Sequence, residues 1–297
     1  MRFLDVKTDY AFKKVFGSTD SKEKLISFLN SIIYKNSKIK IKDLTIVDPY
    51  NIPMIKGMKD TFVDVKASLD DDTKVIIEMQ VIHHTAFEKR VLYNAAKNYS
   101  IQLSKSEDYH LLNPVIALSI VDFTMFDNEN IINRFKLLEK DTFINYSDDI
   151  ELIFVELPKF TMNENELTSI TDQWIYFIKN AGSLEYIPSN LDTNIKNALN
   201  IVNEANLSLD ELEAQHKRKE FISIQKLAIH KAKTDGLEQG LEQGLEQGRE
   251  EGLEKGREEG IKQEKTTIAK NLLAANVSID TIMLSINLTK QEILKLQ

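Results

Sequence analysis

The chain contains 297 residues, which is enough for one large domain or two smaller ones. It has no cysteine, so disulfides, thiolate zinc sites and cysteine nucleophiles are excluded. No apolar run approaches the roughly 18 residues of a membrane helix, and no signal-peptide pattern opens the chain, so we expect a cytoplasmic protein without a membrane partner.

The net charge of −8 is distributed unevenly. Residues 1–110 contain 18 Lys or Arg and 15 Asp or Glu, whereas the remainder contains 20 and 31. Phosphate contacts need local positive charge rather than a basic chain, so the mildly basic first part leaves nucleic acid open as a partner.

Apolar residues at helical spacing predict helix over residues 9–33, broken at Gly17 with a capping residue among the next three positions. Residues 38–48 predict a first strand. Residues 49–59, which include two prolines and a glycine, predict a loop.

Residues 61–82 predict a β-hairpin, because two alternating runs flank an Asp-rich turn at residues 70–73. Each strand then has one apolar face and one largely polar face. Matching the apolar faces places Asp64 opposite Glu78, with Gln80 on the same polar face. A loop with an odd number of residues gives this register.

Two carboxylates side by side on a sheet repel each other, at a cost of roughly 0.2–1 kcal/mol. A bound cation offsets that cost, and carboxylate oxygens suit Mg²⁺ or Mn²⁺. An ordinary solvated polar face explains the same pattern, so the hairpin alone leaves both interpretations open.

The following residues predict one more helix and two more strands. Residues 87–103 predict a helix, one face of which carries Arg90, Tyr93 and Lys97. Residues 114–123 predict a central strand buried on both faces, residues 150–157 predict another strand, and residues 128–138 suggest an irregular segment. This alternation predicts an α/β fold with a mixed sheet flanked by helices.

Beyond the strands, residues 163–233 predict helices. Residues 236–260 repeat a four-residue unit and hold seven of the ten glycines, which predicts a marginal exposed helix or a tether, with a glycine packing stripe as the alternative. Residues 261–297 predict three short helices, the second and third of which would be capped by Ser278 and Thr289. We favour a packing or interaction tail over a base-reading helix-turn-helix there.

Several of these segments resemble the Rpn family of recombination-promoting nucleases, transposase-like members of the PD-(D/E)XK nuclease superfamily. The matching pieces are DYAFKKVFG at residues 9–17, FVDVKA at 62–67, IEMQ at 77–80, FEKRVLYNAAKNYSIQL at 87–103 and the region of Tyr109. The resemblance implies a nuclease-like core over residues 1–160. A helical extension (161–235), the glycine repeat (236–260) and a small helical tail (261–297) would follow.

The resemblance also implies a metal-dependent DNA endonuclease that hydrolyses phosphodiester bonds. The catalytic residues would be Asp64, Glu78 and Gln80. Mg²⁺, for which Mn²⁺ can substitute, would be held by Asp64, Glu78, the Met79 carbonyl and Asp9. Asp9 equally fits a helix N-cap. Asp5, just before the predicted helix, is the runner-up to Asp9, and Asp60, four residues before Asp64, is an alternative ligand on the strand.

The lysine of the superfamily motif is absent, and Gln80 stands in its place. An amide can orient a water or a phosphate oxygen but carries no charge. Lys66 on the same face is a candidate for the missing cation, and Arg90, Tyr93 and Lys97 are candidates for contact with the DNA backbone. Solvation or packing explains these four residues equally well.

Two other classes of function stay open. One is a catalytically silent nucleic-acid-binding protein on the same fold. The other is an assembly protein in which the glycine repeat and the C-terminal helices form a homo-oligomer.

Overall fold

The computed structural model describes residues 1–35, 37–51 and 61–296. The chain forms two compact units, Met1–Lys226 and Leu227–Gln297, and one long helix, α6 (Leu209–Ala274), contributes to both. The finer four-part division expected from the sequence stays a prediction. Among the described residues, no helix has the length and apolar character needed to cross a membrane.

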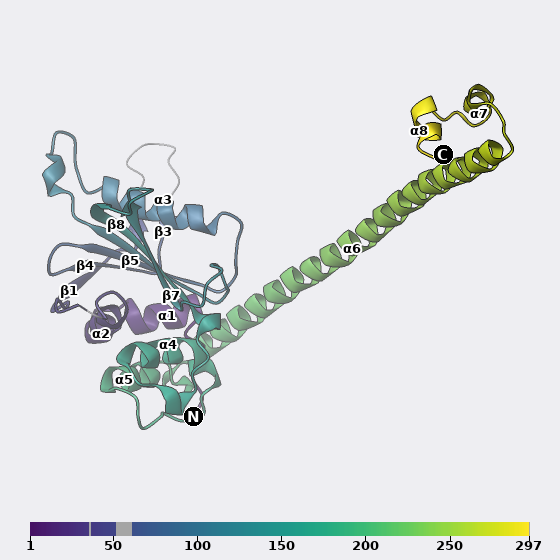
Figure 1. The fold of residues 1–297 in the computed structure, drawn as a ribbon. Coiled ribbons are helices and arrows are strands. Elements are labelled where there is room, and N and C mark those ends of the chain that lie inside the picture. The colour runs from purple at the N-terminus through teal and green to yellow at the C-terminus, as the bar shows by residue number, and fades with distance from the viewer. Residues whose placement is uncertain (36, 52–60, 297) are drawn as a thin grey trace. The chain divides into compact units, whose positions relative to one another are not determined.

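The first unit is built on a six-stranded mixed sheet with the order β1-β4-β5-β6-β8-β7 (Figure 1). The strands are β1 (Leu44–Val47), β4 (Val65–Leu69), β5 (Lys74–Gln80), β6 (Val115–Val121), β7 (Ile132–Leu138) and β8 (Asn145–Glu156). A separate ribbon pairs β2 (Tyr50–Asn51) with β3 (Thr61–Phe62). The pairs β5–β6 and β6–β8 are parallel, and the other neighbours are antiparallel.

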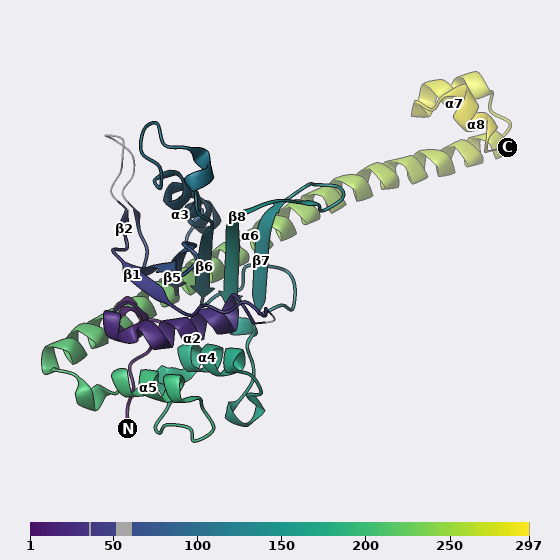
Figure 2. The same cartoon turned by 90° about the vertical axis from the view of Figure 1, so that its left-hand side faces the viewer.

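Helices cover both faces of the sheet (Figure 2). One face carries α1 (Asp9–Phe16), α2 (Lys22–Ile32), α4 (Ile170–Asn180) and α5 (Thr193–Ile201), and the other carries α3 (Phe87–Ser100). Side chains alternate between the two cores, since Ile77 joins the larger cluster with Trp174 and Ile76 joins the smaller one with Phe87. The predicted α/β fold is therefore confirmed.

Short 3-10 turns connect these elements. They lie at Thr19–Ser21, Tyr109–Leu111, Leu157–Lys159, Glu164–Glu166, Ala181–Ser183 and Glu204–Asn206. The first separates α1 from α2, so the predicted break after Gly17 is confirmed.

The strand predictions were partly right. All seven residues of β6 are buried, as predicted for a central strand. The prediction of an irregular segment before residue 138 was wrong, because Ile132–Leu138 forms the edge strand β7. Its last five residues are exposed, and its pairing with β8 shifts register, so it shows no clean alternation of apolar and polar residues.

The second unit ends in a small helical cluster. Ala269 on α6, Ile282 on α7 (Ile279–Ile286) and Ile293 on α8 (Lys290–Leu294) form its buried core. Ser278 accepts a hydrogen bond from the Thr281 N–H, and Thr289 forms a capping box with Glu292. Both predicted caps are confirmed, and the first of the three predicted helices is the end of α6.

The glycine repeat is helical throughout, as part of α6. A Cβ atom added at any glycine from Gly236 to Gly260 would meet no described atom within 4 Å other than neighbouring residues and backbone of its own helix. The repeat is therefore an exposed helix, which is one of the two forms predicted.

Candidate active site

The predicted hairpin has the predicted register. Strands β4 and β5 pair Val65 with Ile77 and Ser68 with Lys74, which extrapolates to Asp64 opposite Glu78. The Leu69 N–H donates to the Thr73 carbonyl and closes a three-residue loop. Asp72, the last residue of that loop, has a φ of 64°, as expected for this kind of turn.

Asp64 lies where the regular ladder between the two strands ends. Its N–H donates to the Ile77 carbonyl at 3.0 Å, and its carboxylate Oδ2 accepts the Met79 N–H at 2.8 Å. A side-chain oxygen thus occupies the place of the next backbone acceptor. The carboxylate is held at the end of the hairpin, and its side chain is only 14% exposed.

Glu78 and Gln80 are joined by an arginine from α3. Arg90 Nη2 donates to Glu78 Oε1 and to Gln80 Oε1, both at 2.6 Å. Gln80 Nε2 donates to the Ile82 carbonyl at 2.7 Å. Both ends of the Gln80 amide are therefore engaged, which fixes its orientation.

The two remaining carboxylate contacts come from α1 and α6. Lys13 Nζ lies 3.4 Å from Asp64 Oδ1. Arg218 Nη2 donates to Asp9 Oδ2 at 3.0 Å, across 209 residues of sequence. Asp9 is the first residue of α1 and Thr8 is the N-cap, so the N-cap interpretation of Asp9 was wrong.

These side chains line one cavity of about 430 Å³ within the first unit. It holds six of the predicted site residues: Asp9, Asp64, Glu78, Met79, Gln80 and Arg90. Four residues of α6 complete its wall: Arg218, Phe221, Ile222 and Gln225. The structure therefore gathers most of the predicted site in one place.

Burial shifts the protonation of both hairpin carboxyls. Burial raises the pKa of Glu78 to about 7, with Arg90 opposing this effect and Asp64 adding to it. Burial also raises the pKa of Asp64, although the Met79 N–H and Lys13 oppose it. Two neighbouring buried carboxyls that resist ionisation form a site where a cation is favoured.

The donor set fits a hard divalent ion in part. Asp64 and Glu78 offer carboxylate oxygens, and Mg²⁺ is commonly bound through one or two carboxylates with water completing its shell. Within the described ranges, no three Asp, Glu or His side chains cluster closely enough to hold a metal ion by themselves. Asp9 lines the same cavity, but Arg218 holds its carboxylate.

Comparison with known proteins assigns the family. A family model described as PD-(D/E)XK nuclease family transposase matches residues 6–232. The chain belongs to this family. No curated protein and no solved structure was found that matches it.

Membership of the PD-(D/E)XK family confirms the resemblance and supports a nuclease-like or transposase-like function. Nucleases of this family generally use divalent metals, and a nuclease-like family implies DNA as the substrate. The matched residues include the whole hairpin, α3 and the part of α6 that lines the cavity. The cavity thus lies entirely within the family region.

Three predicted DNA contacts lie outside this PD-(D/E)XK cavity. Lys97 is only 3% exposed, and its predicted contact with DNA stays a prediction. Lys66 is half-buried near Lys74 and Asp48, and burial lowers its pKa. Tyr93 is 38% exposed and does not line the cavity.

The two alternative ligands play no part in the cavity. Asp5 accepts the Lys7 N–H at 3.1 Å and lines a different cavity. Asp60 lies outside the described residues.

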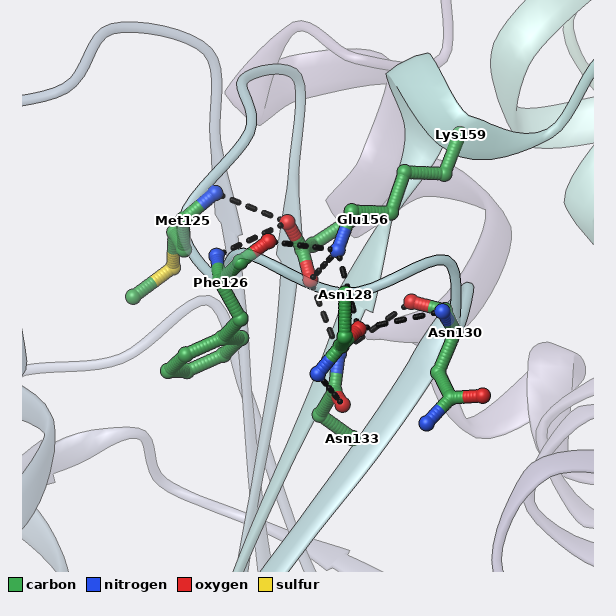
Figure 3. A network of polar contacts seen from close by, with 7 residues as sticks. All are labelled: Met125, Phe126, Asn128, Asn130, Asn133, Glu156 and Lys159. Carbon is green, nitrogen blue, oxygen red and sulfur yellow. Dashed lines mark hydrogen bonds and ion pairs between the residues drawn. The ribbon is translucent and has the colours of Figure 1, made fainter.

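Another buried carboxylate, Glu156, lies outside this cavity in a network of polar contacts (Figure 3). Glu156 is fully buried and, through the parallel register, lies in one row with Val121 and Gln80. Its oxygens accept hydrogen bonds from the backbone of Met125 and Phe126 and from the side chains of Asn133 and Lys159. All of these donors belong to the chain itself, so the role of Glu156 is to fix the loop at Met125 and Phe126 and not to bind a ligand.

The sequence prediction missed Lys13 and the cavity-lining residues of α6. Lys13 carried no signal, since helical lysines are common. For Arg218 a signal existed, because Lys217, Arg218 and Lys219 form a basic run in the acidic half of the chain. Nothing in the local pattern indicates that this run folds back onto the hairpin.

Proposed function

We propose that this protein is a metal-dependent DNA endonuclease that hydrolyses phosphodiester bonds. The observation that carries the proposal is the buried pair Asp64 and Glu78, fixed at the end of a hairpin in a cavity of about 430 Å³. A surface pair of carboxylates would stay solvated and ionised. A buried pair with raised pKa values favours a cation instead.

Asp64 and Glu78 would hold Mg²⁺, or Mn²⁺ in its place, with the Met79 carbonyl and Asp9 as further oxygen donors. The bound ion would lower the pKa of a water and offset charge on the phosphate. Asp64 is oriented for this role by the Met79 N–H. Asp9 would first have to leave Arg218.

Gln80 and Arg90 have separate roles in this proposal. The Gln80 amide, fixed between Arg90 and the Ile82 carbonyl, would orient a water or a phosphate oxygen. Arg90 carries the charge that the motif lysine would otherwise supply. Its side chain is 40% exposed, so its guanidinium can also contact a phosphate.

Further parts of the proposal depend on the resemblance to recombination-promoting nucleases. They are a role in DNA recombination, a cytoplasmic location and a homo-oligomer formed through the C-terminal helices. Lys66 and Tyr93 remain proposed DNA contacts of the outer surface, whereas Lys97 would need α3 to rearrange.

A plasmid-nicking assay tests the proposal. Supercoiled DNA is incubated with Mg²⁺, Mn²⁺, Ca²⁺ or EDTA, using wild type, Asp64→Asn and Glu78→Gln. Asp72→Asn is the matched control, since it removes a carboxylate from the same hairpin and asparagine tolerates a positive φ. We expect Mg²⁺- or Mn²⁺-dependent nicking by wild type and the control, and none by the two site variants.

Two outcomes would refute the endonuclease proposal. Wild-type protein that binds DNA but cuts under no metal would be a silent nucleic-acid-binding protein. Equal cutting by the site variants would move the chemistry away from the hairpin.

A further inference from the structure

The first turns of α6 form a basic wall beside the candidate site. Residues 215–226 contain four Lys or Arg and one Glu, in a chain whose net charge is −8. Arg218, Phe221, Ile222 and Gln225 lie on successive turns and face the cavity that holds the catalytic carboxylates. Arg218 therefore places positive charge in the wall of this cavity.

Two cations of this wall pair with carboxylates. One carboxylate lies at the start of α1 and the other just after β6. Arg218 pairs with Asp9 at 3.0 Å, and Lys226 pairs with Asp122 at 2.7 Å. Asp122 directly follows β6, and Lys7 lies 3.6 Å from the same carboxylate oxygen. Each pair joins α6 to a part of the chain that is distant in sequence.

These ion pairs can be exchanged at low cost. Both ends of the Arg218–Asp9 pair are exposed, at 44% and 51%, and an exposed ion pair contributes on the order of 0–1 kcal/mol. Lys226 is 46% exposed and Asp122 only 13%, but Lys7, at 3.6 Å, stays beside Asp122 when Lys226 leaves. A phosphate that arrives with its own negative charge can replace either carboxylate, whereas a buried ion pair would resist the exchange.

The spacing of the two cations suits a nucleic-acid backbone. Eight residues separate Arg218 from Lys226, which corresponds to about 12 Å along a helix. One strand of B-DNA rises by about 3.4 Å per nucleotide, so the two cations span three to four nucleotides. Arg218 also stacks on Phe221, with 5.6 Å between the guanidinium carbon and the ring centre, which limits its freedom.

We propose that Arg218 and Lys226 bind the phosphate backbone of the DNA substrate, each exchanging its carboxylate partner for a phosphate. The proposal rests on the proposed function for the identity of the substrate. It adds a segment of α6 as a backbone-binding element beside the hairpin. The same exchange releases the Asp9 carboxylate into the cavity that holds Asp64.

The salt dependence of DNA binding by the full-length protein tests this role. Binding of a short duplex is measured by fluorescence anisotropy in EDTA, over a range of NaCl concentrations. The double variant Arg218→Gln/Lys226→Gln should bind DNA more weakly than wild type, and by the same factor for unrelated sequences. The slope of log affinity against log salt should become shallower by about 2, since each lost phosphate contact removes about 0.9.

A matched double variant controls for charge alone. Lys217→Gln/Lys219→Gln removes two charges from the same segment, but Lys217 pairs with Glu213 and Lys219 lines a different cavity. We expect its slope to equal that of wild type. Equal slopes for the two double variants, or a wild-type slope for Arg218→Gln/Lys226→Gln, would overturn the proposal.

Asp122→Asn separates binding from structural damage. It leaves both cations in place and removes the carboxylate that competes for Lys226, so DNA should bind severalfold more tightly. Weaker binding by this variant would also contradict the proposal.

Wild type that binds with the expected slope yet never nicks would refute the endonuclease and leave the backbone contacts standing. If wild type nicks DNA and the salt slopes of the variants equal the wild-type slope, the backbone contacts would be refuted and the endonuclease would stand.

Discussion

At the scale of single residues, Glu78 combines burial with charge. Its side chain is 16% exposed and its pKa is about 7, against an ordinary 4.5. Without metal, the folded protein binds this proton more tightly than the unfolded chain does. The contribution of Glu78 to the free energy of unfolding is therefore full below pH 4.5 and is lost as the pH rises through about 7.

We predict that Glu78→Gln removes this pH dependence. Between pH 5 and pH 8 in EDTA, wild type should lose up to about 3 kcal/mol more stability than the variant, at 1.36 kcal/mol per pKa unit. Urea unfolding at both pH values measures the difference, with Asp72→Asn as the control. Parallel stability curves for wild type and Glu78→Gln would show that Glu78 ionises normally.

Arg90 sets how readily Glu78 gives up its proton. Its guanidinium lies 2.6 Å from the carboxylate and holds the Glu78 pKa below the value that burial alone would give. Arg90→Gln should therefore raise this pKa and shift the pH midpoint of Mn²⁺ binding upward by about one unit. Calorimetric Mn²⁺ titrations from pH 6 to pH 9 measure the midpoint. Lys89→Gln, an exposed charge removal on the same helix, should leave it in place.

At the scale of elements, local pattern decided what could be predicted. The hairpin register followed from alternation within 22 consecutive residues, and the helix break followed from Gly17 and its polar neighbours. Edge strand β7 gave no such pattern, because one side of it is unpaired and most of it is exposed. The basic run around Arg218 is visible in the sequence, but its contact with Asp9 could not be predicted, since it joins positions 209 residues apart.

The glycine repeat gives a prediction for α6. Alanine is about 1 kcal/mol better than glycine in a helix, and a Cβ at Gly240, Gly244 or Gly248 meets no described atom within 4 Å. Replacing all three with alanine should raise the melting temperature of the helix signal at 222 nm. Gly17→Ala is the contrasting variant, because its Cβ would lie 2.8 Å from the Lys13 carbonyl oxygen. It should destabilise the protein.

The same alanine variant tests the glycine packing stripe. If the stripe packs against a second copy of the chain, the added methyl groups would hold the two helices apart. Light scattering would then show a lower mass for the variant than for wild type. An unchanged mass with a more stable helix supports the exposed helix instead.

At the scale of the whole molecule, the family match and the candidate site lie together in the first part of the chain. The match ends at residue 232, and every residue lining the cavity precedes residue 226. We therefore predict that a chain lacking residues 236–297 keeps metal-dependent nicking within about threefold of wild type. Plasmid nicking and light scattering on the two proteins measure activity and mass. Loss of all activity with an intact fold would favour an assembly protein.

The four-residue period of the repeat has a consequence for how this chain tolerates change in length. Each unit adds about 6 Å of helix, and the next unit continues the same Gly-to-Gly interval. Gain or loss of whole units therefore leaves no buried side chain out of place, since no described atom packs against these glycines. The length of α6 can thus change without disturbing the residues that fold the sheet.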